Sequence, residues 1–344
     1  FFVISGYLIT TILIEDIENN RFSIVNFYER RARRILPALF FIMLICIPLV
    51  LFLMLPNQVE YFSRSLIAVS LFVSNILFWR ESGYFDAAAE EKPLLHTWSL
   101  AVEEQYYLLF PIFLILAWRF GKNRVFWMII IIAAISLMIS EWGWRNQPNA
   151  NFYLAPARAW ELLAGSISAF ITKKRGVQKN NLFSFIGLAA ILFSIFIYDK
   201  TTPFPSIYSL LPTMGVVLII LYADRDTLTA KILSTKVFVG MGLISYSAYL
   251  WHQPLFVFGR ISNNFFQESH LMLILTCVSV LFAYFSWKYI EYPFRRKDIF
   301  TRSNIFTMSF LSMLFFCFIG VLGHKTNGFE NYILDEKELL TYKS

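Results

Sequence analysis

Charged side chains are scarce in this 344-residue sequence, where Asp, Glu, Lys and Arg together make up only 15%. A soluble domain needs about a quarter of its residues charged to cover its surface. Hydrophobic residues make up 57% instead, and the mean hydropathy is +0.57. Also missing are a low-complexity linker, a Walker loop, a dinucleotide fingerprint, a zinc-ligand spacing and a G-x-S-x-G elbow. These absences exclude a soluble domain and predict an all-α, polytopic transmembrane helical bundle.

Cysteine is the next scarce residue, with only Cys46, Cys277 and Cys317 present, far apart and each within an apolar run. An odd number at these spacings predicts neither a disulfide framework nor a metal site. The net charge of +7 would suggest a nucleic-acid partner in a soluble protein. In a membrane protein it indicates positively charged cytoplasmic loops, so we expect membrane lipid as a partner and no nucleic acid.

Apolar stretches of roughly 15–23 residues, near the length that crosses a bilayer, recur about eleven times. They lie at 1–14, 35–55, 62–79, 97–117, 125–141, 157–172, 182–198, 207–223, 237–259, 271–290 and 304–322. The sequence starts without Met inside the first stretch, so we expect a fragment that begins within a helix.

Basic clusters predict which helix ends face the cytoplasm. They lie at 30–34, 119–124, 173–175, 225–236 and 295–297, whereas the acidic stretch 86–91 belongs on the opposite side. Three apolar stretches separate the first two clusters, and three full crossings would put those clusters on opposite sides. One stretch should therefore be re-entrant or interfacial, and 62–79 is the candidate because it is short and carries Arg64 and Asn75. About ten true crossings remain, and the tail from Gly323 is expected to be extracytoplasmic.

Polar side chains on one helical face form the first candidate site. At 100° per residue, His96, Ser99, Glu103 and Tyr107 share a face, and Trp98 points away from it. A histidine and a glutamate seven residues apart could act as a base and its orienting carboxylate. Spacing alone slightly favours the alternative, a helix entering the membrane at its polar end with its tyrosines in the aromatic belt.

A histidine inside an apolar stretch marks the second candidate site. Ser245, Tyr249 and His252 share a face, and Pro254 frees a backbone carbonyl one turn earlier. Imidazole titrates near neutral pH, which suits proton transfer. A neutral imidazole hydrogen-bonded between helices fits the same pattern equally well.

The third candidate is a predicted loop at 28–37 that carries Arg30, Arg31, Arg33 and Arg34. Arginines so placed commonly anchor a protein at anionic headgroups. They could equally bind a polyphosphate ligand, because guanidinium contacts phosphate oxygens through two parallel hydrogen bonds.

Three weaker signals predict structural contacts. Arg158 and Glu161 lie one turn apart and should neutralise each other. Glu291 lies at a helix end, where it should bond backbone or an arginine. Ser5 and Gly6 permit another helix to approach closely.

Five segments, in this order, carry a family resemblance: FFVISGYLIT (1–10), FYERRARRILP (27–37), HTWSLAVEEQYY (96–107), ISYSAYLWHQP (244–254) and IEYP (290–293). Together they resemble the acyltransferase-3 family of bacterial membrane acyltransferases, which O-acylate cell-surface glycans. The resemblance spans residues 1–297, and the order of five separate motifs makes it specific.

The resemblance implies a multi-pass O-acyltransferase of the bacterial inner membrane, an enzyme that transfers acyl groups other than aminoacyl groups. Its expected donor is acyl-CoA, most simply acetyl-CoA, used as a substrate with no permanently bound cofactor and no metal. Its expected acceptor is a hydroxyl of an envelope glycan such as lipopolysaccharide O-antigen. The implied catalytic residues are Glu103, His252 and His96. The implied substrate- and donor-binding residues are Arg30, Arg31, Arg33, Arg34, Trp98, Ser99, Tyr107, Tyr249 and Ser5.

The sequence departs from the family pattern at its start, because the family's first spanning helix, with an arginine and a histidine proposed as central to catalysis, is not in it. We expect an acyltransferase-like membrane domain over 1–297, an additional helix over 298–322 and an extracytoplasmic tail over 323–344, which resembles the subgroup with a following SGNH-type domain. Two other functions stay open. One is a proton-coupled transporter with a relay through His252, Glu103 and Glu161, although no internal repeat supports it. The other is a non-catalytic scaffold.

Overall fold

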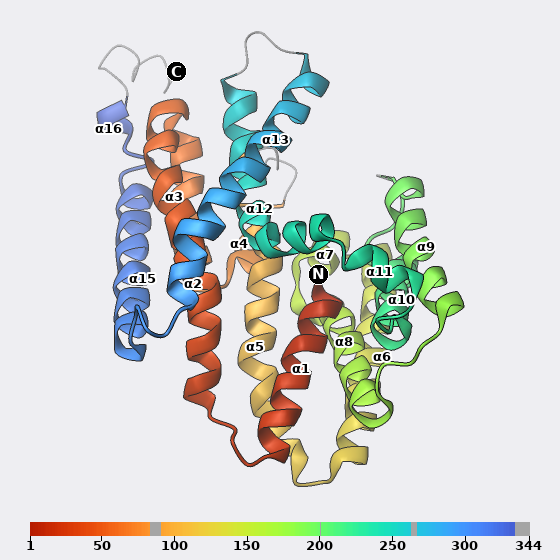
Figure 1. The fold of residues 1–344 in the computed structure, drawn as a ribbon. Coiled ribbons are helices and arrows are strands. Elements are labelled where there is room, and N and C mark those ends of the chain that lie inside the picture. Colours follow the sequence, from red (N-terminus) through yellow and green to blue (C-terminus); the bar gives the residue numbers. More distant parts are fainter. Residues whose placement is uncertain (83–90, 200, 263–266, 334–344) are drawn as a thin grey trace. The chain divides into compact units, whose positions relative to one another are not determined.

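The computed structural model describes residues 1–82, 91–199, 201–262 and 267–333. Across these residues the chain is helical and forms no strand, only an isolated bridge between Lys179 and Ala223 (Figure 1). The predicted all-α class is confirmed. Most of the acidic stretch 86–91 and the tail beyond Ile333 lie outside the described residues.

The helices alternate with short connections. Their bounds are α1 (Phe2–Glu18), α2 (Ile24–Leu53), α3 (Pro56–Ser70), α4 (Ser74–Arg80), α5 (Thr97–Trp118), α6 (Lys122–Asn146), α7 (Pro148–Tyr153), α8 (Ala155–Arg175), α9 (Asn181–Ile197), η2 (Ile207–Ser209), α10 (Leu210–Tyr222), α11 (Leu228–Leu233), α12 (Lys236–Ile261), α13 (Glu268–Ser286), the π-helical turn η3 (Trp287–Glu291), α14 (Tyr292–Arg295), α15 (Arg302–Lys325) and α16 (Glu330–Ile333).

Among the described residues, five helices are long and apolar enough to cross a membrane: α2, α5, α6, the run Glu268–Arg295 and α15. Helices α9 and α10 are apolar but shorter, whereas α8 and α12 have 21 and 26 residues and are more polar. The expected number of about ten crossings stays a prediction.

The arginine-rich segment is helical, which corrects the prediction of a loop at 28–37. It lies inside α2, a helix of 30 residues that also accommodates Pro37 and Pro48. The side chains of Glu29 and Arg33, one turn apart, form an ion pair of 2.9 Å that supports helical winding.

The stretch 62–79 is interrupted, and its expected re-entrant or interfacial position stays a prediction. It forms α3, of 15 residues, and α4, of 7 residues, separated at Leu71–Val73. At Phe72 the backbone has a φ of 54°, which a continuous right-handed helix cannot accommodate.

The chain divides into two compact units, one of residues Phe1–Ile24 and Val102–Val239 and the other of Val25–Ala101 and Gly240–Ser344. In the first unit α1 packs on α8, α8 on α6, and α9 on α10. A Cβ on Gly6 would lie 1.8 Å from the Leu162 carbonyl oxygen, and one on Gly165 would lie 1.9 Å from that of Val3. The close helix approach predicted at Gly6 is therefore confirmed.

In the second unit α15 packs along α3, and the contact again depends on a small residue. A Cβ on Gly320 would lie 2.6 Å from the carbonyl oxygen of Ser63. Helix α15 also meets α2, where the rings of Phe40 and Phe316 stack with centroids 5.4 Å apart.

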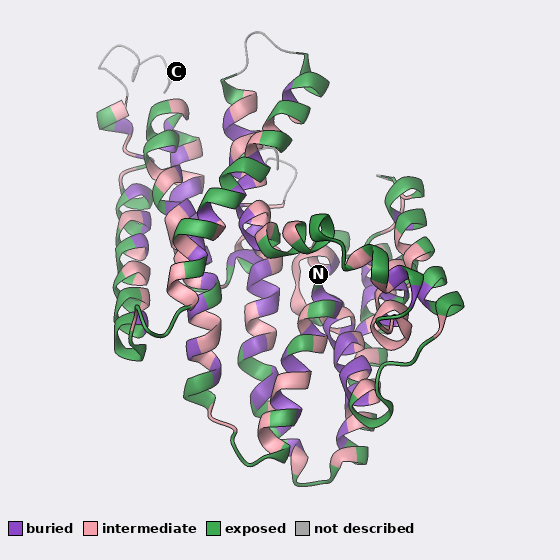
Figure 2. Cartoon of the chain, in the orientation of Figure 1, coloured by how far each residue is buried: buried purple, intermediate pink, exposed green. Residues whose placement is uncertain are grey.

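Large apolar side chains are exposed along many of these helices (Figure 2). On α6, for example, Trp127 and Met138 are 61% and 63% exposed, and on α15 Phe318 is 65% exposed. A soluble protein does not leave such continuous apolar surface in water, whereas hydrocarbon is a suitable solvent for it. The burial pattern therefore agrees with a multi-pass membrane protein.

Candidate functional site

A buried carboxylate, Glu103 of α5, is the centre of the polar cluster in the first unit. Its Oε1 accepts hydrogen bonds from the hydroxyls of Ser5, on α1, and Tyr107, one turn further along α5. Glu103 and Tyr107 are 4% and 3% exposed, so the carboxylate is largely withdrawn from solvent. The structure thus brings Ser5, Glu103 and Tyr107 together, and their roles in catalysis and binding stay predictions.

A second hydrogen-bonded chain runs beside the same helices and was missed by the sequence analysis. The Thr10 hydroxyl donates to Ser166 Oγ over 2.9 Å, and Ser166 Oγ lies 2.6 Å from the Tyr106 hydroxyl. The three residues come from α1, α8 and α5. Serine and threonine inside apolar helices are a weak signal for such interhelical bonds, and nothing in the sequence pairs these three.

In the second unit, two histidines far apart in sequence meet. The ring centroids of His96 and His252 lie 5.2 Å apart, and that of Tyr249 lies 4.9 Å from His96. The Tyr249 hydroxyl donates to the His96 carbonyl oxygen over 2.5 Å and lies 3.0 Å from Ser99 Oγ. The start of the motif at 96–107 therefore meets the motif at 244–254 in one cluster of the second unit.

The hydrogen bonds of His252 determine which ring nitrogen carries its proton. Nδ1 lies 2.6 Å from the carbonyl oxygen of Tyr249. Because a carbonyl oxygen only accepts, Nδ1 donates, and in a neutral ring Nε2 then has an available lone pair. His252 is half-buried, so this lone pair belongs to a group suited to accept a proton.

His96 is almost fully buried and poorly satisfied. It is 8% exposed, and neither ring nitrogen has a hydrogen-bond partner of normal geometry among the described residues, although the backbone of Pro93 lies nearby. Such a buried group is unfavourable by about 1–3 kcal/mol. Unsatisfied polar groups of this kind are typical of functional positions.

The guanidinium of Arg33 is taken up by the protein itself. Besides the ion pair with Glu29, it donates to the carbonyl oxygens of Phe294, Arg296 and Phe300 at 3.2, 3.4 and 2.8 Å. The side chain is 4% exposed. Arg33 therefore holds α2 against the segment before α15, and its predicted contact with donor phosphates stays a prediction.

The other arginines of the segment are more accessible. Arg34 is exposed, and Arg30 and Arg31 are half-buried. Their predicted contact with phosphate stays a prediction, and it does not conflict with their positions.

A second buried carboxylate, Glu291, connects three helices of the second unit. It accepts hydrogen bonds from Ser247, on α12, and from Arg295, the latter over 2.6 Å. The expected bond to an arginine is confirmed. One residue before Ser247, the Tyr246 hydroxyl donates to the Ile35 carbonyl oxygen over 2.9 Å. Glu291 ends a π-helical turn, a distortion often found at functional positions.

The structure changes which serine of α12 faces the protein interior near Tyr249 and His252. Ser245, which was expected to share a face with Tyr249 and His252, is exposed and bonds the carbonyl oxygen of Gly242 in its own helix. Ser247, which was not singled out, is buried instead. Trp98 is half-buried, and its binding role stays a prediction.

Arg158 and Glu161 form the expected structural pair. Their side chains are joined at 2.8 Å, and the Arg158 guanidinium lies 4.4 Å from the centroid of Phe204. Within the described residues, no three histidines, cysteines or carboxylates approach closely enough to hold a metal ion.

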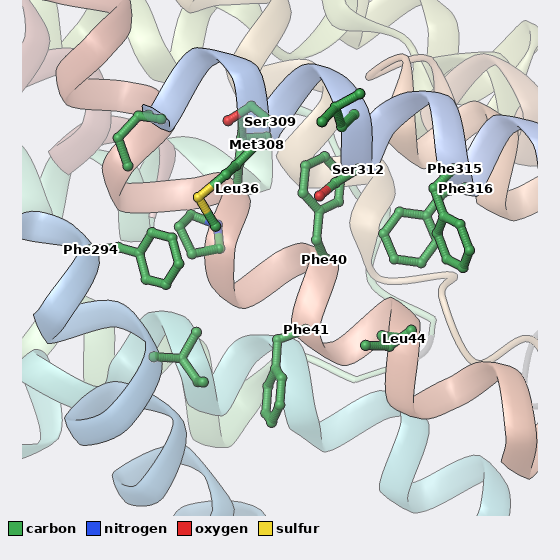
Figure 3. Close-up of a pocket in the computed structure, with 14 residues that line it drawn as sticks. Leu36, Phe40, Phe41, Leu44, Phe294, Met308, Ser309, Ser312, Phe315 and Phe316 are labelled. Carbon is green, nitrogen blue, oxygen red and sulfur yellow. The ribbon is translucent and has the colours of Figure 1, made fainter. Parts of the chain in front are cut away.

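An apolar pocket of about 480 Å³ lies in the second unit between α2, the end of α13–α14 and α15 (Figure 3). Phe40, Phe294, Met308 and Phe315 are among its lining residues, and its only polar side chains are Ser309 and Ser312. It offers no acid, base or cation for chemistry.

Comparisons with known proteins show which family and which relatives the sequence resembles. Residues 1–288 match a family model described as an acyltransferase domain, acyltransferase-3. The sequence is 32% identical over 320 residues to an O-acetyltransferase OatA of Staphylococcus aureus, covering 86% of this chain and 52% of that protein. It is 30% identical over 317 residues to the peptidoglycan O-acetyltransferase OatA of Listeria monocytogenes, covering 86% and 50%.

A third relative, an uncharacterized protein of Haemophilus influenzae, is 36% identical over 234 residues, which cover 64% of this chain and 95% of that protein. The chain spans about half the length of the two acetyltransferases. No solved structure matches it.

Proposed function

This chain belongs to the acyltransferase-3 family, and from that premise we propose that it is the membrane part of an O-acyltransferase. The enzyme transfers an acetyl group from acetyl-CoA to a hydroxyl of a cell-envelope glycan. The observation that carries the proposal is the meeting of His96 and His252 through motifs about 150 residues apart, with Nε2 of His252 available as a proton acceptor.

The reaction has a simple balance. His252 Nε2 accepts the proton of the acceptor hydroxyl while its oxygen attacks the thioester carbonyl. The tetrahedral intermediate collapses, the carbon–sulfur bond breaks, and the coenzyme A thiolate takes up a proton on leaving. The ester forms on the glycan, and no oxidant or reductant is needed. His96, adjacent to His252, is the partner for relaying the proton.

We assign donor binding to Arg30, Arg31 and Arg34, on the outer part of α2. The fork geometry of guanidinium suits the phosphates of coenzyme A. Arg33 supports this site by holding α2 in place through backbone carbonyls. Because basic clusters favour the cytoplasm, the donor would enter from that side, with the membrane being the bacterial inner membrane.

Glu103 is the second catalytic candidate. Its bonds to Ser5 and Tyr107 hold one oxygen of the carboxylate in place. A carboxylate so fixed is able to accept a hydrogen bond from a substrate hydroxyl. Ser99 and Tyr249 would position the histidines.

The acceptor is the least constrained part of the proposal. Lipopolysaccharide O-antigen is the glycan that the family resemblance suggests, whereas the Listeria relative is a peptidoglycan O-acetyltransferase. Both offer sugar hydroxyls, so the class of acceptor is an envelope glycan in either case.

The test is transfer of labelled acetyl from acetyl-CoA to glycan in membranes that contain the full-length protein, with O-antigen and peptidoglycan analysed separately. His252→Gln should lower kcat by about 10²–10⁴-fold, the usual contribution of a general base. His270→Gln is the matched control, because His270 is exposed on α13. Equal activity of both variants would remove His252 from the mechanism.

The donor site has its own test. Arg34→Gln should raise the KM for acetyl-CoA by roughly tenfold, since a hydrogen bond to a charged group contributes about 1.5–3 kcal/mol. The exposed Arg21→Gln serves as control. Absence of transfer from any acyl-CoA, together with proton-coupled uptake of a solute into proteoliposomes, would support the transporter alternative instead.

A further inference from the structure

A second pocket, of about 480 Å³, lies at one end of the first unit between α6 and α8. Its lining includes Lys122 and Phe126 from α6 and, from α8, Phe170, Lys174 and Arg175. Lys122 belongs to the basic cluster 119–124, and the other two cations belong to the cluster 173–175. The packing of α6 on α8 brings these two clusters to the same end of the unit.

The pocket has more positive than negative charge. Glu18 is the carboxylate beside it, and that group is already shared by Lys122, at 2.5 Å, and Lys173, at 3.4 Å. Lys174 and Arg175 are exposed and form no ion pair within the described part of the chain. They are therefore free to bind an anion that enters the pocket.

The apolar part of the lining of the same pocket contains two aromatic rings, those of Phe126 and Phe170. Phe170 is 5% exposed, its centroid lies 5.9 Å from that of Phe126, and Trp118 lies beside it at 6.3 Å. Ile171 extends this apolar surface. A ligand that fills the pocket therefore needs both an anionic group, to meet the cations, and an apolar part, to cover the aromatic and aliphatic side chains.

We propose that this pocket binds an anionic phospholipid of the bilayer. The phosphodiester lies against Lys174 and Arg175, with Lys122 nearby, and the upper part of an acyl chain covers Phe126, Phe170 and Ile171. Basic pockets between transmembrane helices at the cytoplasmic face are typical binding sites for such headgroups.

The apolar pocket of the second unit is a useful contrast (Figure 3). It has a similar volume, but its lining contains no cation. It could accept an acyl chain without selecting the headgroup, whereas the pocket between α6 and α8 should discriminate between headgroups of different charge.

The experiment measures lipid binding to the purified full-length protein by native mass spectrometry, with phosphatidylglycerol and phosphatidylcholine as the two probes. The variant is the double substitution Lys174→Gln and Arg175→Gln, which leaves the Lys122–Glu18 ion pair intact. Its control is Lys231→Gln with Lys236→Gln, which removes the same charge from exposed lysines that do not line the pocket.

Each cation near an anionic headgroup contributes about a fivefold factor in affinity. We expect the pocket variant to bind phosphatidylglycerol at least tenfold more weakly than wild type, with no change in phosphatidylcholine binding and no change in the control. Salt should weaken the wild-type affinity for phosphatidylglycerol only.

Three results would overturn the proposal: undiminished phosphatidylglycerol binding by the pocket variant, an equal loss in the control, or displacement of the lipid by free coenzyme A at this pocket. The last would assign the pocket to a soluble phosphate ligand. Thermal unfolding of each variant verifies that it is folded, and acyl transfer is not needed for any of these readings.

Discussion

A methyl group added at Gly6 should force apart two helices that now touch through their backbones. The new Cβ would lie 1.8 Å from the Leu162 carbonyl oxygen and 2.7 Å from its carbon. Both are backbone atoms, so no side chain can rotate away. To reach ordinary van der Waals contact, α1 and α8 must separate by on the order of 1.5 Å.

We expect Gly6→Ala to destabilise the protein by about 1–3 kcal/mol, the usual effect of overpacking. An alanine in an unconstrained helix would stabilise by about 0.5–1 kcal/mol relative to glycine. The sign of the change is therefore diagnostic. The neighbouring hydroxyl of Ser5 should also withdraw from Glu103, so acyl transfer should fall with stability.

The assay is thermal unfolding of the purified protein in detergent, with Gly240→Ala and Gly242→Ala as controls. A Cβ at either control position meets nothing within 4 Å. Gly165→Ala should behave like Gly6→Ala, and the double variant should lose less than the sum, because the first substitution already separates the helices. If Gly6→Ala and Gly165→Ala both unfolded at the wild-type temperature, the close contact between α1 and α8 would be refuted.

Three further predictions concern buried and paired charges. Arg33→Gln should destabilise the protein by about 3–5 kcal/mol, because it leaves the buried carboxylate of Glu29 partly unpaired. If thermal unfolding were unchanged and the KM for acetyl-CoA were raised, Arg33 would be a phosphate ligand instead. Ser247→Ala removes a donor to Glu291 and should reduce stability by about 1–3 kcal/mol, measured in the same way. Burial would raise the pKa of Glu60, but the hydrogen bonds and charges of Arg64 and His324 outweigh it and lower the pKa below the ordinary value of 4.5. The stability that ionised Glu60 contributes should be present at neutral pH and be lost as the pH falls through the lowered pKa. Thermal unfolding measured over a range of pH should show this loss for the wild type, and Glu60→Gln should abolish it.

Hydropathy was sufficient to find most helices. The stretches at 97–117 and 304–322 correspond to α5 and α15 within a few residues. It failed at Leu71–Val73, where three apolar residues break the helix between α3 and α4. Such a break depends on tertiary packing, and hydropathy does not register it.

Helical periodicity placed Ser99, Glu103 and Tyr107 correctly on α5, because their spacing is a property of one helix. It could not identify Thr10 or Ser166, whose partners come from other helices. The contacts of Arg33 with backbone carbonyls could not be foreseen for a related reason. An arginine that binds backbone carbonyls looks the same in sequence as one that binds phosphate.

The π-helical turn at Trp287–Glu291 makes the helix tolerant of a change in its length at this point. A π turn holds one more residue than an α turn. Deleting the exposed Lys288 should therefore let the segment wind as an ordinary α-helix while the residues after it keep their faces, so that Glu291 can still meet Ser247 and Arg295. The same deletion within the regular part of α13 would rotate every later residue of the helix by about 100°. The π turn is thus a place where one residue can be lost without a change of register.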